Sequence, residues 1–371
     1  MNIVFINANS LKLFSGPEHW LAEICPRLVK RNHNVYVLAP KPDFGKARIS
    51  SSEIKRYFSG VRYYELNSIK LKFLSKSCVP VQIPSGIRAD VIYQLNGYAF
   101  QEIYGFLFSR IKNIPLIYGI HAPLFTNYSL HNKYVKTVFK FFAKQASGIH
   151  VLNRSTANIM KSWGIKRISL IENGVNLEKF KPPKTLCKKN FKVLYVGRLA
   201  FEKGFDILCS AIEIVNRNDQ FRSNIKFTIV GKGPLIYLVN KLVSQYQNIT
   251  YIEYVREEDM PILYQQHNLF VLPARFETFP LPPIEAQATG LPVILSDIDE
   301  LRDIIIPNAS GILITPDSSI ELANTILRLE KIYRERPDYY NAMQKMARWN
   351  AIQRFNIEKT VKRLEILFEK I

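Results

Sequence analysis

The sequence predicts an α/β protein with two doubly wound domains, and three features of the chain indicate this fold. Its 371 residues are enough for two ordinary domains. Apolar runs of strand length alternate with helical periodicity in both halves, which is typical of parallel sheets with helices on both faces. The segment 179–190 is rich in Pro and Lys and lacks periodicity, as linkers do. We therefore expect domains at residues 1–180 and 181–350, and a C-terminal helix at 351–371 that crosses back to the first domain.

Short apolar runs place the strands, and amphipathic stretches place the helices between them. In the first half, strands are expected at 3–6, 35–38, 91–93, 116–118 and 149–152, with helices at 17–31 and 131–146. In the second half, strands are expected at 191–196, 226–230, 250–252, 269–272 and 293–295, with helices at 204–216, 234–246 and 282–290. Ligands of such sheets bind at the carboxyl ends of the strands, so the loops that follow the strands are the places to look for a site.

Composition limits the class of protein. With 47% hydrophobic and 22% charged residues, the chain has the composition of a soluble globular protein. No run of about eighteen apolar residues predicts a transmembrane helix, and the N-terminus lacks the charge and cleavage site of a signal peptide. The four cysteines are scattered without metal-ligand spacing, which indicates reduced thiols. We therefore expect a cytoplasmic protein.

The net charge of +20 lies almost wholly in the first half. Residues 1–180 hold 25 Lys and Arg against 9 Asp and Glu, whereas residues 181–371 hold 26 against 22. Such a field attracts an anionic membrane surface, a nucleic acid or an acidic acceptor. Four lysines share one face of a predicted helix: Lys133, Lys136, Lys140 and Lys144. Apolar side chains fall opposite: Val135, Val138, Phe139 and Phe142. This pattern fits either a solvated amphipathic helix or a helix docked on an anionic membrane.

The segment 269–295 carries the strongest indication of a binding site. Its pattern predicts a strand, a loop and a helix that begins near Leu281, so the amides of Phe279 and Leu281 are candidate donors to a phosphate. Glu277 in the loop and Glu285 in the helix are hydrogen-bond acceptors suited to sugar hydroxyls. The alternative for Glu285 is a partner of the helix dipole.

A second strand-to-helix turn, at 195–204, places Arg198 and Lys203 five residues apart. Both can reach a diphosphate through charge-assisted hydrogen bonds, each worth about 1.5–3 kcal/mol. The alternative is that they are solvated surface charges. A third turn contains Gly231 and Gly233, which predict either a phosphate-binding loop or only a tight turn.

Together these segments resemble the motifs of the retaining glycosyltransferase family 4, which has the GT-B fold. Residues 171–180 (IENGVNLEKF) are similar to its PNGVD…F segment, and residues 196–204 are similar to its GRL…KG loop. Glu277 and Glu285 have the spacing of its E-x7-E signature. The resemblance covers the second half of the chain and implies two Rossmann-like domains that face each other across a cleft.

The resemblance also implies roles for individual residues. Arg198 and Lys203 would bind the donor diphosphate, together with the amides of Phe279 and Leu281. Glu285 would hold the ribose hydroxyls. Glu277 would contact the donor sugar near the reacting carbon and is the catalytic candidate of this half.

In the first half the resemblance is looser. Residues 15–18 (SGPE) are similar to the family's G-G-x-E turn, so Gly16 would let the backbone approach the donor phosphate. His121 ends a strand similar to the one that delivers a histidine to the donor sugar, and it is the second catalytic candidate. A purely structural histidine is the alternative. Further residues implied near the donor are Glu18, Asn173, Gly174, Gly231, Gly233 and Val255.

The implied activity is transfer of a hexose, with retention, from a UDP- or GDP-linked sugar to a hydroxyl of a glycan or lipid-linked acceptor. Cell-surface polysaccharide or glycolipid synthesis would use such a step. No metal is implied, because cationic side chains and helix amides neutralise the leaving diphosphate. Glu172 and Glu253 depart from the family pattern, so its base preference is not carried over. The basic acceptor domain favours a protein peripheral on the cytoplasmic face of a membrane.

Three rival functions are open at this point. A nucleotide-sugar epimerase would use the same fold and donor site. A nucleic-acid-binding protein would account for the charge, but no zinc finger, helix-turn-helix or RNA-binding aromatic motif appears, so we expect no nucleic acid as partner. A non-catalytic relative would bind the nucleotide without transfer, and the intact set of charged candidates speaks against it.

Overall fold

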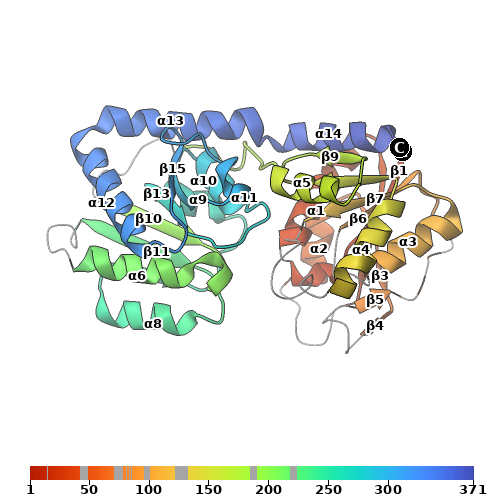
Figure 1. Ribbon diagram of the computed structural model, residues 1–371, viewed down its shortest axis with the longest axis horizontal. Coiled ribbons are helices and arrows are strands. Elements are labelled where there is room, and N and C mark those ends of the chain that lie inside the picture. Colours follow the sequence, from red (N-terminus) through yellow and green to blue (C-terminus); the bar gives the residue numbers. More distant parts are fainter. Residues whose placement is uncertain are drawn as a thin grey trace. The chain divides into compact units, whose positions relative to one another are not determined.

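The computed structural model describes residues 1–14, 16–41, 49–70, 78–80, 82, 84, 86–95, 101–121, 133–183, 190–217 and 224–371. These residues form two compact units, each with a parallel sheet covered by helices (Figure 1). Unit 1 consists of Met1–Asn173 and Ile357–Ile371, and unit 2 of Gly174–Asn356. The predicted α/β class with two parallel-sheet domains is confirmed.

The sheet of unit 1 has seven strands in the order β3-β2-β1-β6-β7-β8-β9, all parallel. Their bounds are β1 (Asn2–Ile6), β2 (Asn34–Pro40), β3 (Arg62–Leu66), β6 (Val91–Leu95), β7 (Leu116–Ile120), β8 (Gly148–Val151) and β9 (Ile168–Leu170). A separate antiparallel pair is formed by β4 (Ser68–Lys70) and β5 (Cys78–Pro80). The strand order reverses between β1 and β6, which is the point where doubly wound sheets bind ligands.

The helices of unit 1 enclose a core on each face of the sheet. They are η1 (Leu11–Leu13), α1 (Gly16–Lys30), α2 (Ser51–Tyr57), α3 (Gln101–Lys112), α4 (Lys133–Gln145), α5 (Arg154–Ser162) and α14 (Ile357–Glu369). Side chains alternate along β1, so Ile3 and Phe5 lie in one apolar cluster while Val4 and Ile6 lie in the other. This alternation explains why β1 is apolar throughout.

Helix α14 belongs to unit 1 although it ends the chain. Its Val361, Leu364 and Phe368 are buried in the same cluster as Phe5, whose ring meets that of Phe368 edge-on at 6.2 Å. The helical spacing of these side chains predicts such a packing face. The C-terminal helix is therefore part of the hydrophobic core of unit 1.

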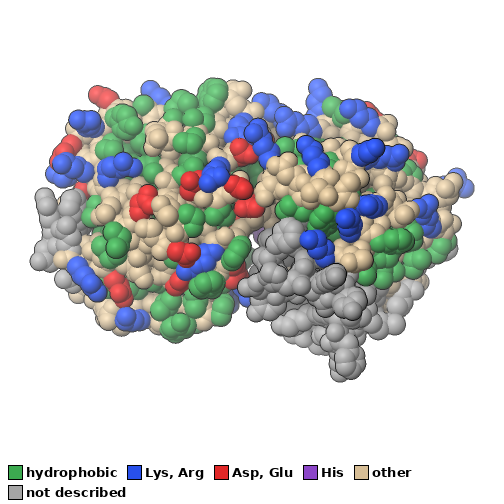
Figure 2. Space-filling view, viewed as in Figure 1, with side chains coloured by type: hydrophobic (Ala, Val, Ile, Leu, Met, Phe, Trp, Pro, Cys, Tyr) green, Lys and Arg blue, Asp and Glu red, His purple; other side chains and the backbone are tan. Residues whose placement is uncertain are grey.

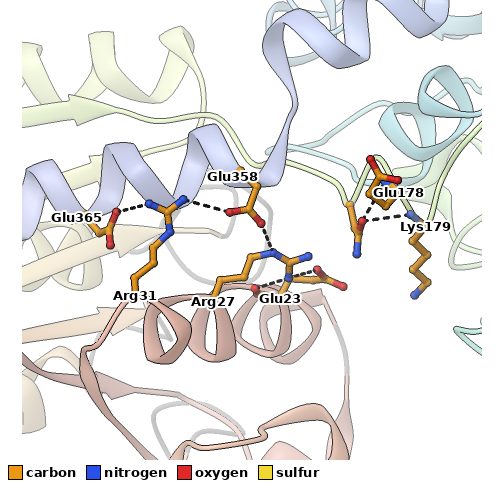
Figure 3. Close-up of polar contacts among 8 residues, drawn as sticks. Glu23, Arg27, Arg31, Glu178, Lys179, Glu358 and Glu365 are labelled. Carbon is orange, nitrogen blue, oxygen red and sulfur yellow. Dashed lines mark hydrogen bonds and ion pairs between the residues drawn. The ribbon is translucent and has the colours of Figure 1, made fainter.

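Two arginines of α1 also pair with acidic residues of α14 (Figure 3). Arg27 donates to Glu358 at 2.9 Å, and Arg31 donates to Glu358 at 3.1 Å and to Glu365 at 3.0 Å. Burial alone would raise the pKa of Glu358, but the hydrogen bonds from Arg31 and Arg27 bring it below its ordinary value. Exposed ion pairs contribute only about 0.2–1 kcal/mol each, so the apolar face of α14 is the main anchor.

The sheet of unit 2 has six strands in the order β12-β11-β10-β13-β14-β15, and their pairings are parallel. Their bounds are β10 (Phe191–Val196), β11 (Ile225–Val230), β12 (Ile249–Ile252), β13 (Leu269–Leu272), β14 (Val293–Ser296) and β15 (Gly311–Ile314). The order reverses between β10 and β13. The loops that follow these two strands therefore meet at the ligand-binding edge of the sheet.

Helices cover both faces of this second sheet as well. They are η2 (Phe201–Lys203), α6 (Phe205–Asn216), α8 (Ile236–Gln245), α9 (Met260–Gln265), α10 (Pro282–Ala288), α11 (Asp299–Arg302), α12 (Ser319–Glu335) and α13 (Pro337–Arg354). In Figure 1, α6 and α8 lie on one side of the sheet, and α9, α10 and α13 lie on the other. The central strands are buried on both faces, as continuous apolar runs predict.

The two units meet in the sequence after Asn173, several residues before the boundary expected at 180–190. Arg348 of α13 explains the difference, because its guanidinium donates to the carbonyls of Leu177 at 3.2 Å and Phe180 at 2.7 Å. Phe180 is buried and its ring meets that of Tyr264 at 5.9 Å. The segment from Gly174 to Phe180 is thus held within unit 2. The second division lies after Asn356 rather than near 350.

Two further expectations concern thiols and membranes. Cys25 and Cys209 are buried free thiols, whereas Cys187 and the side chain of Cys78 lie outside the described residues. In the part of the chain that the structure describes, no helix combines the length and the apolar character needed to span a bilayer.

Candidate active site

Three loops of unit 2 are fastened together at the carboxyl ends of neighbouring strands. The loop after β10 is bonded to the loop after β11, since the Leu199 amide donates to the Lys232 carbonyl and the Leu235 amide to the Leu199 carbonyl, both at 2.9 Å. It is also bonded to the loop after β13, because the Arg275 amide donates to the Glu202 carbonyl at 3.0 Å. These loops carry most of the residues predicted to bind the donor diphosphate, namely Arg198, Lys203, Phe279 and Leu281.

Glycines allow these loops to approach so closely. A Cβ on Gly231, which has φ of +138°, would lie 1.9 Å from the Gly197 carbonyl oxygen. One on Gly204, with φ of +64°, would lie 1.7 Å from the Pro273 carbonyl oxygen, and one on Gly233 would lie 2.2 Å from that of Leu199. Only glycine fits such positions. The structure thus gives Gly231 and Gly233 a role in packing loop against loop, and their predicted contact with the donor stays a prediction.

Lys203 and Glu277 form an ion pair between two of these loops. Lys203 ends η2 after β10, and Glu277 lies in the loop between β13 and α10. The Glu277 side chain is buried, so its charge needs a cation nearby. Two residues that the sequence assigns to the donor site, 74 positions apart, are therefore in direct contact.

Arg198 lies on the same turn as Lys203 but faces solvent. Its side chain is 64% exposed and pairs with Glu202 at 3.1 Å. The buried Tyr195 hydroxyl donates to the Arg198 carbonyl at 2.8 Å, which fixes the backbone of the turn while the guanidinium stays accessible. An exposed guanidinium beside a paired ammonium suits an incoming anion.

Glu285 lies in the first turn of α10 and is half-buried. The hydroxyl of Tyr264 donates to its Oε2 at 2.7 Å. Burial, and then the charge of Glu285, raise the pKa of Tyr264 well above its usual range, so the hydroxyl keeps its proton and its role as donor. The nearby Phe279 is buried with its ring 5.9 Å from that of Phe355, and Leu281 is the N-cap of α10 without a side-chain cap bond.

Arg275 is a residue of this region that the sequence reasoning missed. It donates to both carboxylate oxygens of Asp206 at 2.7 Å and to Asp317 at 2.6 Å, and its guanidinium stacks 3.7 Å above the Phe201 ring. It thereby anchors the loop that carries Glu277 to the start of α6. Arg275 lies only two residues before Glu277, but its acidic partners are 69 and 42 positions away, so no local pattern indicates these contacts.

In unit 1, the residues predicted after β1 have different surroundings. Gly16 begins α1 and is exposed, and a Cβ built on it would meet nothing within 4 Å. Glu18 is completely buried and accepts a hydrogen bond from the Asn7 side chain at 2.6 Å. Glu18 thus fastens the loop between β1 and α1. Ser15 lies outside the described residues.

His121 directly follows β7 and is bonded to a buried tyrosine. The Tyr93 hydroxyl lies 2.8 Å from His121 Nε2 and 2.6 Å from His150 Nδ1. Burial, and then the proximity of His150, lower the pKa of His121 well below its usual range, so the imidazole is neutral at pH 7. His150 is not among the residues predicted from the sequence, because it is connected to His121 only through Tyr93.

The remaining donor-site candidates lie near the junction of the units or after β12. Asn173 is buried and ends unit 1, and Gly174 begins unit 2. Val255 is half-buried in the segment after β12, where Glu253 pairs with Lys232. Their predicted contacts with a donor stay predictions.

The lysine face of α4 differs from the predicted solvated stripe. Lys136 lies over the Trp163 ring at 5.6 Å and Lys140 is half-buried, so Lys144 is the most exposed of the described lysines of this face. The side chains of Lys133 and Val135 lie outside the described residues. The exposed side of α4 instead includes Phe141, which is 55% exposed, because Phe139 and Phe142 turn towards the core.

Other apolar and basic groups surround this exposed side. Leu107 and Ile111 of the adjacent α3 are 47% and 66% exposed. A pocket of about 320 Å³ lies beside Lys144, and its lining includes Lys166 and Arg167. Figure 2 shows several Lys and Arg side chains on this face of unit 1 with few acidic ones between them.

Comparison with known proteins identifies the family. Residues 177–348 match the family model described as glycosyl transferases group 1, and residues 14–179 match the model described as glycosyltransferase family 4. The two matches together span most of both units. The chain belongs to the group 1 glycosyltransferases.

Two relatives of this glycosyltransferase have names that include a lipid. It is 28% identical, over 72% of each chain, to UDP-Gal:alpha-D-GlcNAc-diphosphoundecaprenol alpha-1,3-galactosyltransferase of Escherichia coli. It is 23% identical to alpha-monoglucosyldiacylglycerol synthase of Acholeplasma laidlawii, over 94% of this chain and 92% of the relative. Among solved structures, Anabaena HepE in complex with UDP matches the whole of both chains with a TM-score of 0.79 at 18% identity. The shared fold is GT-B, as the resemblance implies.

Proposed function

We propose that this glycosyltransferase transfers a hexose from a UDP- or GDP-linked sugar, with retention, to a hydroxyl of a glycan or lipid-linked acceptor. The observation that carries the proposal is the contact of Lys203 with Glu277 where the sheet order of unit 2 reverses. This contact brings an ammonium and a carboxylate together at the place where doubly wound sheets bind nucleotides. Arg198 lies on the same turn as Lys203, and Glu285 lies in the first turn of α10, which follows the loop of Glu277.

Each charged group has a distinct role in this proposal. Lys203 and Arg198, together with the amides of Phe279 and Leu281, bind the diphosphate and neutralise the charge that develops as it leaves, so no metal is required. Glu285, oriented by Tyr264, accepts hydrogen bonds from the ribose hydroxyls. Glu277 contacts the donor sugar.

The proposal also gives roles to two residues of unit 1. Gly16 lets the backbone of the loop after β1 approach the donor phosphate. His121 contacts the donor sugar. In the step itself, the acceptor oxygen bonds to the anomeric carbon on the face from which the phosphate oxygen departs. The acceptor proton passes to that phosphate oxygen.

The acceptor side of the proposal rests on the surface of unit 1. Lys144, Lys166 and Arg167 line one pocket with positive charge, and Phe141 of α4 and Ile111 of α3 are exposed. Basic groups beside apolar ones favour docking on an anionic leaflet, at about 1 kcal/mol for each Lys or Arg. The lipid acceptors in the names of both relatives agree with this choice. We therefore propose a peripheral enzyme on the cytoplasmic face of a membrane that serves polysaccharide or glycolipid synthesis.

The test is a transfer assay with UDP- and GDP-sugars and lipid-linked or glycan acceptors. We expect Lys203→Ala and Glu285→Ala each to lose most of the activity, by about a hundredfold or more, because each removes a charged contact to the donor. Lys241→Ala is the matched control, since this lysine of α8 pairs with Glu213 of α6, outside the loops that carry the proposed site. Wild-type turnover in both variants would contradict the proposal. Conversion of the donor sugar without any acceptor would instead indicate an epimerase.

A further inference from the structure

A chain of buried hydrogen bonds runs across the sheet of unit 1 and ends at His121. His121 Nε2 lies 2.8 Å from the Tyr93 hydroxyl, which lies 2.6 Å from His150 Nδ1. His150 Nε2 in turn lies 2.8 Å from the carbonyl oxygen of Ile171. Tyr93 is in β6, His150 is in β8, His121 follows β7 and Ile171 follows β9, so the chain crosses four adjacent strands.

The Ile171 carbonyl at one end of this series of hydrogen bonds determines which atom is the donor in each of them. A carbonyl oxygen only accepts, so His150 Nε2 carries a hydrogen and donates it to Ile171. Burial lowers the pKa of His150 to about 4, although the bond to Ile171 opposes this shift. At pH 7 its ring is therefore neutral, and Nδ1 accepts the hydrogen of the Tyr93 hydroxyl. The Tyr93 oxygen is then left to accept, and His121 Nε2 donates to it.

The backbone makes room for the central hydroxyl of this chain. A Cβ on Gly119 of β7 would lie 1.9 Å from the Tyr93 oxygen, so a glycine is needed where the hydroxyl passes between the strands. Tyr93 and His150 are completely buried. The Trp20 ring lies 4.4 Å from the His121 ring and 5.6 Å from the Tyr93 ring, which excludes water from one side. The arrangement is thus enclosed by packing as well as by hydrogen bonds.

We propose that Tyr93 and His150 are positioning residues that hold His121 as the neutral tautomer with its hydrogen on Nε2. Nδ1 of His121 is then a hydrogen-bond acceptor and never a donor. The inference rests on the proposed function, in which His121 contacts the donor sugar. For any group that meets Nδ1, this tautomer favours a hydroxyl that donates and disfavours a group that can only accept, such as a carboxylate.

The tautomer of His121 can be measured by NMR spectroscopy without substrate. Long-range ¹H–¹⁵N spectra of the ¹⁵N-labelled full chain distinguish protonated from unprotonated ring nitrogens, and His121→Asn assigns the His121 signals. We expect wild-type His121 to carry its hydrogen on Nε2 at pH 6–8. A hydrogen on Nδ1, or a charged ring at pH 7, would overturn the proposal, and this wild-type result depends on no variant.

Tyr93→Phe removes the central hydroxyl and its two hydrogen bonds. We expect the His121 signals of this variant to shift to a mixture of tautomers. Tyr118→Phe is the matched control, because Tyr118 is equally buried in β7 and donates to the Glu102 carbonyl at 2.9 Å, outside the chain of bonds. Unchanged His121 signals in Tyr93→Phe, or the same shift in the control, would contradict the proposal.

A kinetic comparison separates failure of this inference from failure of the proposed function. With an active transferase, we expect Tyr93→Phe to lower kcat/KM by about tenfold, while Tyr118→Phe leaves it near the wild-type value. An Nε2–H tautomer in a protein without transferase activity would contradict the proposed function but keep the positioning role. Wild-type kcat/KM in Tyr93→Phe would contradict the positioning role alone.

Discussion

At the residue scale, Lys203 and Glu277 neutralise each other's charge. A buried carboxylate without a cation is costly, and the ammonium supplied from the neighbouring loop removes that cost. In the proposed function, a diphosphate would meet an ammonium that the ion pair already holds in place. The pair thus explains how Glu277 tolerates burial.

Tyr264 is expected to matter for donor binding although it bears no charge. Tyr264→Phe removes the hydroxyl that orients Glu285, so we expect nucleoside diphosphate affinity to fall by about tenfold through a less ordered ribose contact. Isothermal titration calorimetry measures this change. Tyr340→Phe removes another buried hydroxyl of unit 2, one that donates to the Asn268 carbonyl, and should bind as the wild type does. Equal affinities for the wild type, Tyr264→Phe and Tyr340→Phe would contradict a role of Tyr264 in donor binding.

The sequence identified the charged residues on the loops but not the residues that hold them. Lys203 and Glu277 follow strands in a recognisable pattern, and they meet because those strands are adjacent. Tyr264 and Arg275 act on groups 21 and 69 positions away, and no local periodicity records such a contact. His150 could not be predicted from the sequence either, because it is linked to His121 only through two hydrogen bonds of Tyr93.

At the element scale, the loops of unit 2 depend on glycine for close packing, whereas the loop before α1 does not. We expect Gly231→Ala to lower the melting temperature, because its φ of +138° and the Gly197 carbonyl 1.9 Å from the new Cβ both oppose a side chain. Gly16→Ala should keep the melting temperature, since its Cβ meets nothing within 4 Å, but should weaken donor binding if the backbone there approaches a phosphate. Thermal melts and titrations of both variants check this contrast. A stable Gly231→Ala protein would contradict the packing role.

Most elements were predictable because the core strands are continuous apolar runs. A strand missed by the prediction is β3, whose sequence RYYEL is partly exposed. Its pairing with β2, and not its own composition, makes it part of the sheet. The boundary after Asn173 also depends on a distant contact. Arg348 donates to carbonyls of the segment that follows Asn173 and so holds this segment in unit 2.

At the scale of the whole molecule, the excess positive charge of residues 1–180 predicts a salt-dependent association with anionic lipid. We expect co-sedimentation with phosphatidylglycerol-containing vesicles at low salt and a clear loss of binding at about 0.5 M salt. Lys144→Glu should weaken the binding, whereas Lys331→Glu in α12 of unit 2 changes the charge equally and should have a smaller effect. Absence of binding to anionic vesicles at low salt would contradict the proposed membrane surface.

The central claim is that the loops after β10 and β13 bind a nucleoside diphosphate. Calorimetric titration of the full chain with UDP and with GDP tests it most directly, using Lys203→Met and, as control, Lys241→Met. We expect saturable heat with at least one nucleotide, an affinity about ten- to a hundredfold lower in Lys203→Met, and an unchanged affinity in Lys241→Met. No heat with either nucleotide, or equal affinity in Lys203→Met and the wild type, would contradict it.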